Sequence, residues 1–217
     1  MNIFITGMID KTTVNNVFRQ IVNCPEDEEF IVVYINSCGG EGESDYAIYE
    51  ALKQSSKTII THAVQEVYSA AMTIYLAGDQ RYAHRYSSFM IHEPYHDEVD
   101  SDKKTMATYK DNISELKKMT DSYFQLISEN TKLTPAKINS YIKKEKDGDW
   151  VFGTNLALTL GVVTDIGLPI IPTDIEWGVE FTPENKPESK DEEEEPEGSE
   201  VEGHARKRRP RRRPSLG

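Results

Sequence analysis

Three residues in this sequence have the side-chain types and local settings of a nucleophile, a general base and an orienting acid. Ser69 directly precedes a short apolar segment, His92 ends the apolar run 89–91, and Asp149 precedes the apolar pair 150–151. A neutral imidazole titrates near ~6.5, which suits proton transfer from a serine hydroxyl at cellular pH. A carboxylate that orients the imidazole completes the set used by serine hydrolases. The three residue types therefore predict acyl-transfer chemistry if the fold brings them together.

A glycine pair supplies the other part that such chemistry requires. Gly39 and Gly40 follow the β-branched run 30–35 and precede an expected helix. Glycine lets the backbone approach a substrate closely and aim N–H groups at an oxyanion. The simpler interpretation is a tight turn that needs positive φ. A phosphate-binding loop is excluded, because neither the Walker spacing nor the dinucleotide-binding spacing is present.

Each of the three side chains also has an ordinary structural interpretation. A serine where a strand gives way to a helix is commonly an N-cap, and a histidine after an apolar strand can be hydrogen-bonded within the core. Asp149 follows Gly148, as aspartates in turns often do. Local sequence alone favours the cap for Ser69 and the turn for Asp149, and leaves both interpretations of His92 open.

Strand and helix patterns alternate along the chain and position these residues. Such alternation predicts an α/β layered fold with a largely parallel sheet. Ser69 is expected at the junction between a strand and a helix, and His92 at the end of a strand. Strands are expected at 2–6, 30–35, 58–63, 81–83 and 88–91, and residues 161–165 are expected to lead to a closing strand. Helices are expected from a cap at Thr12 or Thr13 to Val22 and at 43–54, 69–77, 103–130, 134–144 and 156–160.

Composition and length restrict the class of protein. A chain of 217 residues can form one ordinary domain with an appendage. No stretch approaches the roughly 20 apolar residues of a membrane span, and no export signal opens the sequence, so we expect a cytoplasmic protein without membrane contact. Cys24 and Cys38 are expected to be reduced thiols, and no ligand cluster predicts a metal or another cofactor.

Charge divides the chain into a body and a tail. The net charge is −12, and an acidic run at 191–195 precedes a basic run at 206–213. Proline-rich, charged sequence with few apolar residues does not fold by itself. We therefore expect a domain at 1–181 and a disordered tail at 182–217. The basic run can bind nucleic acid, bind an acidic partner or fold back on the acidic run, and we favour the last of these.

Four segments in a fixed order resemble the proteolytic subunit of the Clp protease (ClpP), a family of self-compartmentalised serine peptidases. The turn INSCGG is similar to the family's INSPGG, and Ser69 is followed nine residues later by the glycine of LAG. The stretch from RYA to MIHEP resembles the one that ends in the family's catalytic histidine. Asp149, twelve residues before the glycine of LGVVTD, takes the place of the catalytic aspartate. The resemblance covers residues 2–168 and leaves the tail unmatched.

The resemblance implies a ClpP/crotonase-type spiral of β-β-α units and a homo-oligomeric ring, a hexamer or heptamer that can stack. It implies a serine endopeptidase that acts on extended peptides or unfolded proteins through an acyl-enzyme. Ser69, His92 and Asp149 are then the catalytic residues, and the N–H groups of Gly39 or Gly40 and of Ala70 form the oxyanion hole. Neither a metal nor an organic cofactor is required.

Departures from the family pattern bear on assembly and partners. Cys38 replaces a proline, and bulky Val67 and Tyr68 precede the serine, where they are expected to narrow the substrate groove. Residues 95–100 lack the glycine-rich pattern of the family's ring-to-ring contact, and the sequence begins at the first strand. Double rings and a Clp-type ATPase partner therefore do not follow from the resemblance.

Two other functions stay open at this stage. A virus-encoded head-maturation protease would use the same core and act without an ATPase. A crotonase-like acyl-CoA enzyme or an inactive ring subunit would keep the fold and change the chemistry. The presence of all three catalytic residue types argues against an inactive subunit.

Overall fold

The computed structural model describes residues 1–95 and 105–169, which lie within one compact unit. The predicted tail at 182–217 lies wholly outside the described residues. The segment 95–100, which departs from the family pattern, lies outside them except for residue 95. The elements, in chain order, are β1 (Asn2–Ile9), α1 (Lys11–Val22), β2 (Phe30–Gly40), α2 (Gly42–Lys53), β3 (Thr58–Tyr68), α3 (Ala70–Tyr75), β4 (Gln80–Ala83), β5 (Ser88–Ile91), α4 (Met106–Asn130), α5 (Pro135–Ile142), β6 (Trp150–Gly153), α6 (Thr154–Leu160) and β7 (Asp165–Ile166).

The strands form one sheet in the order β1-β2-β3-β4-β7, and every neighbouring pair on this path is parallel. Strand β3 also pairs with β5 through residues 66–68, and β5 pairs with β6 in the antiparallel sense. Helices connect most of the parallel strands, as a crossover between parallel neighbours requires. The predicted α/β architecture with a largely parallel sheet is confirmed.

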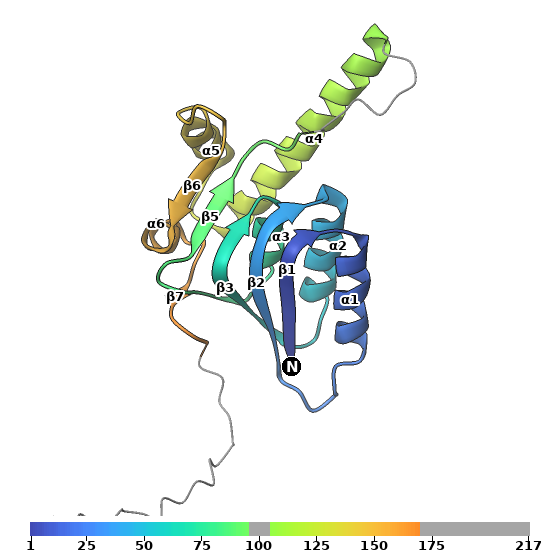
Figure 1. Ribbon diagram of the computed structural model, residues 1–217, viewed down its shortest axis with the longest axis vertical. Helices are drawn as coiled ribbons and strands as arrows, with labels where there is room; N and C mark the ends of the chain where they lie inside the picture. The colour runs from blue at the N-terminus through green and yellow to red at the C-terminus, as the bar shows by residue number, and fades with distance from the viewer. Residues whose placement is uncertain (96–104, 170–217) are drawn as a thin grey trace, which may run out of the picture. The chain divides into compact units, whose positions relative to one another are not determined.

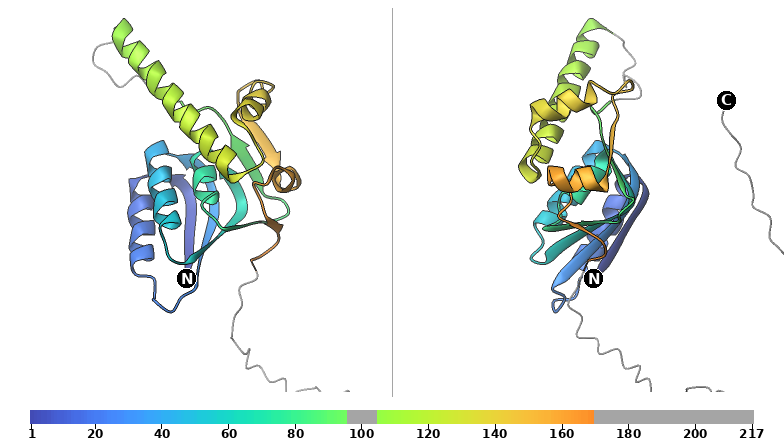
Figure 2. Two further views of the ribbon diagram at one scale, coloured as in Figure 1. Left: turned by 180° about the vertical axis from the view of Figure 1, so that it is seen from behind. Right: turned by 90° about the vertical axis from the view of Figure 1, so that its left-hand side faces the viewer.

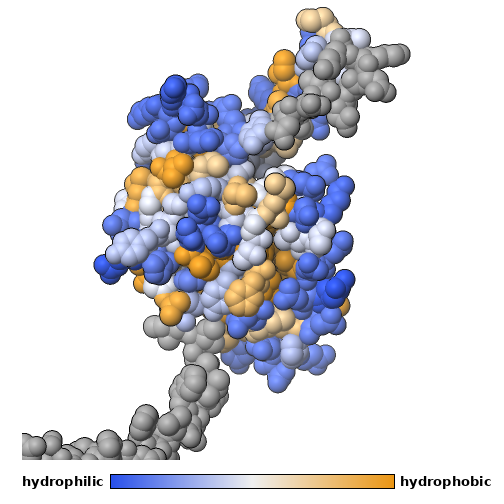
Figure 3. All heavy atoms as spheres, in the orientation of Figure 1, coloured by the Kyte–Doolittle hydropathy of each residue, from blue (hydrophilic) through white to orange (hydrophobic). Residues whose placement is uncertain are grey.

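Helices α1, α2 and α3 cover one face of the sheet, while the other face of β1, β2 and β3 looks toward the viewer (Figures 1 and 2). On that open face Phe4 stacks on Tyr34, with ring centroids 5.1 Å apart. Apolar residues lie there among hydrophilic ones (Figure 3). Helix α4 extends away from the sheet, and the residues that it buries all lie at its C-terminal end, from Tyr123 to Ile127.

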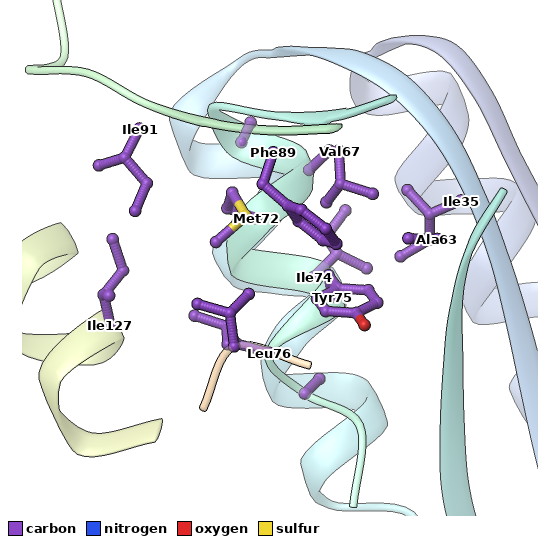
Figure 4. Packing of buried hydrophobic residues seen from close by; sticks show 14 of the residues in the cluster. Ile35, Ala63, Val67, Met72, Ile74, Tyr75, Leu76, Phe89, Ile91 and Ile127 are labelled. Atoms are coloured by element: carbon purple, nitrogen blue, oxygen red, sulfur yellow. The ribbon is translucent and has the colours of Figure 1, made fainter. Parts of the chain in front are cut away.

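The main core lies between the sheet and the helices, directly beneath the segment that carries Ser69. Helix α3 is buried along its whole length, which explains its apolar sequence. Its Met72 and Tyr75 lie near Phe89 of β5 and Val67 of β3 (Figure 4). Such dense packing tolerates few changes of side-chain volume, so the position of α3 is well defined.

Several boundaries differ from the predictions for physical reasons. Asp10, and not Thr12 or Thr13, caps α1, because its side chain accepts the Thr13 N–H while Thr13 reaches back to the Asp10 N–H. Strand β2 continues past the predicted end at 35 to Gly40, because its last residues still pair with β1. Strand β3 continues past 63 to Tyr68, because residues 66–68 pair with β5. The expected closing strand follows the 161–165 segment as the short strand β7, Asp165–Ile166.

Candidate active site

Ser69 occupies a sharp turn between β3 and α3, as predicted. Its backbone has φ 53° and ψ −122°, and it has the one positive φ among the described residues other than glycine. These angles match the first central position of a type II′ turn, where glycine dominates. Ser69 stands at the N-cap position, but its side chain forms no capping hydrogen bond. The capping interpretation is therefore wrong, and the hydroxyl is left for another partner.

Three hydrogen bonds to the Ser69 backbone, two from other backbone groups and one from a side chain, hold this turn in place. The Ser69 N–H donates to the Met90 carbonyl of β5 at 3.0 Å. The Ser69 carbonyl accepts the Met72 N–H at 2.8 Å and the Tyr123 hydroxyl of α4 at 3.2 Å. A strained backbone conformation persists only where the surrounding structure determines it in several ways. At Ser69, β5, α3 and α4 each contribute one of these three hydrogen bonds.

His92 lies directly after β5, and its Nε2 is 2.6 Å from the Ser69 Oγ. The side chain is only 12% exposed, and the Tyr95 ring lies against it edge to face at 5.4 Å. Burial lowers the pKa of His92 below its usual value, although the nearby Asp149 carboxylate opposes this shift. The imidazole is therefore mostly neutral at pH 7, the form that can accept the serine proton.

Strand pairing brings Asp149 to the other side of the imidazole. Because Ile91 is paired with Trp150 in the antiparallel β5–β6 ladder, the next residues along the two strands are His92 and Asp149. The Asp149 Oδ1 is 3.8 Å from the His92 Nδ1, and the carboxylate is 52% exposed. This distance exceeds hydrogen-bond range, so Asp149 acts on the ring through its charge in this conformation. Catalytic contacts are often long without substrate and tighten when substrate binds.

The glycine turn reaches the nucleophile through Gly39. A Cβ at this residue, whose φ is +103°, would lie 2.8 Å from the Ser69 Cβ, 2.9 Å from the Tyr68 carbonyl oxygen and 3.3 Å from the Ala70 nitrogen. Only glycine fits so close to the backbone on both sides of Ser69. Gly40 instead packs against the Ile9 backbone of β1. The structure therefore brings Gly39 and Ala70 next to Ser69, and holds Gly40 against the edge strand.

The Gly39 N–H already has a partner in this conformation. It donates to the Ser37 hydroxyl at 3.1 Å, and that hydroxyl donates to the Gly7 carbonyl at 2.6 Å. The same polar chain holds the glycine turn against the end of β1. An oxyanion that approached Ser69 would have to compete with the Ser37 hydroxyl for this N–H group.

Some residues of the site carried no signal in the sequence. Tyr123, which holds the Ser69 carbonyl, is one aromatic among several on a long amphipathic helix. The expected narrowing of the groove by Val67 is wrong, because this side chain is fully buried in the core. Tyr68 forms a hydrogen bond with the Ser88 hydroxyl at 2.7 Å.

The remaining chemical expectations concern cysteines, metals and membranes. Cys24 and Cys38 form no disulfide within the described residues. Within residues 1–95 and 105–169, no three histidine, cysteine, aspartate or glutamate side chains are grouped so that they could hold a metal ion. None of the helices in this part of the chain is long and apolar enough to cross a membrane.

Comparison with known proteins identifies relatives of this chain. Residues 1–168 match the sequence model of the Clp protease family. The ATP-dependent Clp protease proteolytic subunit 2 of Pseudomonas aeruginosa is 30% identical over 95 residues, which cover 42% of this chain and 47% of that protein. The corresponding proteolytic subunit of Pleurastrum terricola is 33% identical over 96 residues, which cover 42% and 49%. The chain thus spans about half the length of the curated relatives it matches.

A solved structure matches over a longer region. A point mutant of ClpP1 from Listeria monocytogenes superimposes with a TM-score of 0.65 and 25% sequence identity. The superposition covers 77% of this chain and 91% of the Listeria chain. This likeness confirms the predicted ClpP-type fold.

Proposed function

Because the chain belongs to the Clp protease family, we propose that it is a serine endopeptidase that hydrolyses peptide bonds through Ser69, His92 and Asp149. The observation that carries this proposal is the 2.6 Å contact between the His92 Nε2 and the Ser69 Oγ. A nucleophile within hydrogen-bond reach of a base, which is itself next to a carboxylate, is the arrangement that activates serine.

The proposed reaction proceeds in two steps through an acyl-enzyme. The Ser69 Oγ attacks the peptide carbonyl while the His92 Nε2 takes its proton, and Asp149 stabilises the imidazolium that forms. The imidazolium then gives the proton to the leaving amine as the peptide C–N bond breaks. Water, deprotonated by the same imidazole, cleaves the resulting ester and releases the second product and the free serine.

The N–H groups of Ala70 and Gly39 are proposed to bind the oxyanion, with Gly40 as the alternative within the glycine turn. Loss of one such donor typically costs on the order of 10²–10³ in rate. Gly39 is favoured over Gly40 because its backbone packs directly against Ser69 and Ala70. In this scheme the Gly39 N–H exchanges the Ser37 hydroxyl for the oxyanion when substrate binds.

The substrate class we propose is an extended peptide or an unfolded protein segment, added as a strand beside the glycine turn. The relatives are named as proteolytic subunits of an ATP-dependent protease. By likeness to them, we propose that this chain assembles with further copies of itself into a ring.

The test is the intact mass of the protein after reaction with a fluorophosphonate probe. The wild-type chain should gain one adduct, whereas a folded Ser69→Ala variant should gain none, because only an activated serine reacts. Ser140→Ala, an exposed serine on α5, is the matched control and should label like the wild type. An adduct that persists in Ser69→Ala, or its absence from the wild type between pH 6 and 9, would refute the proposal.

A further inference from the structure

A large, exposed aromatic side chain lies against the proposed base. The Tyr95 ring contacts the His92 imidazole edge to face, with ring centroids 5.4 Å apart and an interplanar angle of 63°. The two side chains differ in exposure, since His92 is mostly buried whereas Tyr95 is 66% exposed. The imidazole therefore covers part of the Tyr95 ring, and most of the ring is open to a ligand.

The short connection between the two residues limits how far Tyr95 can move. Tyr95 follows His92 by three residues, and Pro94 directly precedes it. The proline ring fixes its own φ and holds the residue before it in an extended conformation. A tyrosine ring also has only two side-chain torsions to lose when it binds a partner. Tyr95 thus offers contact area at a low entropic cost, and it opens the segment 95–100, which departs from the family pattern.

The open face of β5 and β6 next to the proposed acid and base is apolar. Met90 is paired with Val151 in the β5–β6 ladder, and side chains two residues apart along a strand point to the same face. His92 and Asp149 therefore continue the face of Met90 and Val151, while the alternate residues of both strands belong to the core. Val151 is 54% exposed and Met90 is half-buried. A substrate side chain that reaches the base on this face meets an apolar surface.

The chemistry of the base brings a substrate residue within reach of Tyr95. The His92 Nε2, which is 2.6 Å from the Ser69 Oγ, must also reach the leaving nitrogen of the scissile bond. That bond therefore lies beside the imidazole. Because successive Cα atoms of a peptide are about 3.8 Å apart, a ring centred 5.4 Å from the imidazole centre lies within one or two residues of the scissile bond.

We propose that Tyr95 is a specificity-determining residue, whose exposed ring forms one wall of a subsite for a large apolar substrate side chain within two residues of the scissile bond. The inference rests on the proposed function, since it concerns the same site. Aromatic and aliphatic side chains gain the most from this contact, because they bury a large apolar area against the ring. The half-exposed Asp149 carboxylate, next to the same imidazole, disfavours an acidic side chain there.

The test is the cleavage profile of a mixture of short peptides, with the cleavage sites located by mass spectrometry. The wild type should prefer phenylalanine, tyrosine, leucine or methionine at one fixed position near the scissile bond. For such peptides, relative to the same peptides with glycine at that position, Tyr95→Ser should lose at least about tenfold in kcat/KM, mainly through a higher KM. Tyr95→Phe keeps the ring and should keep the preference. Tyr86→Ser, which removes another exposed tyrosine from the segment between β4 and β5, is the matched control and should give the wild-type profile.

Peptide binding gives a readout that does not require catalysis. A fluorescein-labelled peptide rich in leucine and phenylalanine should bind Ser69→Ala about tenfold more tightly than the double variant Ser69→Ala/Tyr95→Ser, as measured by fluorescence anisotropy. If the wild type neither labels with fluorophosphonate nor cleaves, but this difference in binding is present, the proposed function fails and the subsite stands.

Two results would overturn the inference and leave the proposed function standing. The first is an identical cleavage profile for the wild type and Tyr95→Ser, with equal binding of the peptide to the two Ser69→Ala proteins. The second is slower fluorophosphonate labelling of Tyr95→Ser with an unchanged profile, because Tyr95 would then act through His92 and not on the substrate.

Discussion

The backbone at Ser69 predicts an unusual order of stability among variants of the nucleophile. With φ 53° and ψ −122°, the residue has a conformation that glycine adopts readily and that a side chain with a Cβ does not. Both Ser69→Ala and Ser69→Gly remove the hydroxyl and should abolish activity. They differ in that alanine keeps the backbone strain and glycine relieves it.

The expected difference follows from two opposing terms. A non-glycine residue in a sparsely populated backbone region costs about 1–3 kcal/mol. Glycine, for its part, loses more conformational freedom on folding than alanine, at a cost of about 0.5–1 kcal/mol. We therefore expect the free energy of unfolding of Ser69→Gly to exceed that of Ser69→Ala by about 1 kcal/mol, the difference between these terms.

The assay is urea denaturation of both variants at one protein concentration, because self-association makes apparent stability concentration-dependent. Ser140, an exposed residue in the regular helix α5, is the matched control site. There the order should reverse, with glycine less stable than alanine by about 1 kcal/mol. If Ser69→Gly is less stable than Ser69→Ala by a similar amount, Ser69 is not strained and the reasoning is wrong.

Two further predictions concern the acid of the proposed triad and a half-buried arginine. Asp149→Asn should slow fluorophosphonate labelling by on the order of 10²–10⁴, because it removes the charge that stabilises the imidazolium. Asp147→Asn, at an exposed position, is the control. If the two variants label at equal rates, Asp149 is not part of the triad. The Arg81 guanidinium donates to the carbonyls of residues 78, 130, 161 and 162 at 2.8–3.1 Å. Arg81→Ala should lower the free energy of unfolding by about 3 kcal/mol, because these four carbonyls lose their charged donors. The control, Arg85→Ala at an exposed position, should change the free energy of unfolding by less than about 0.5 kcal/mol. If urea denaturation gives similarly small changes for both variants, Arg81 does not have this role.

Much of the fold could be predicted because it depends on local patterns. The apolar, β-branched run that opens β2 predicts a buried strand wherever it occurs, and apolar residues at helical spacing predicted α1. The junction before Ser69 was predictable for the same reason, since a strand pattern ends and a helical one begins there. Element ends were less accurate: the extension of β3 to Tyr68 depends on pairing with β5, which the local sequence does not encode.

The residue types of the proposed triad were likewise visible in the sequence, but their contacts were not. In the sequence, His92 precedes and Asp149 follows the helices α4 and α5. Only the pairing of Ile91 with Trp150 in the β5–β6 ladder brings the two residues together. The same holds for Tyr123 at the Ser69 carbonyl, since this hydrogen bond joins α4 to the turn before α3.

The sequence by itself thus determined the kind of elements and the chemical groups available, because hydrophobic periodicity and residue type are local properties. The tertiary structure decided the strained turn at Ser69, the register between β5 and β6, and the burial of Asp45 in α2. These features arise from hydrogen bonds and desolvation between segments far apart in the chain. Their free energies exist only once the core has formed, and no local pattern specifies them.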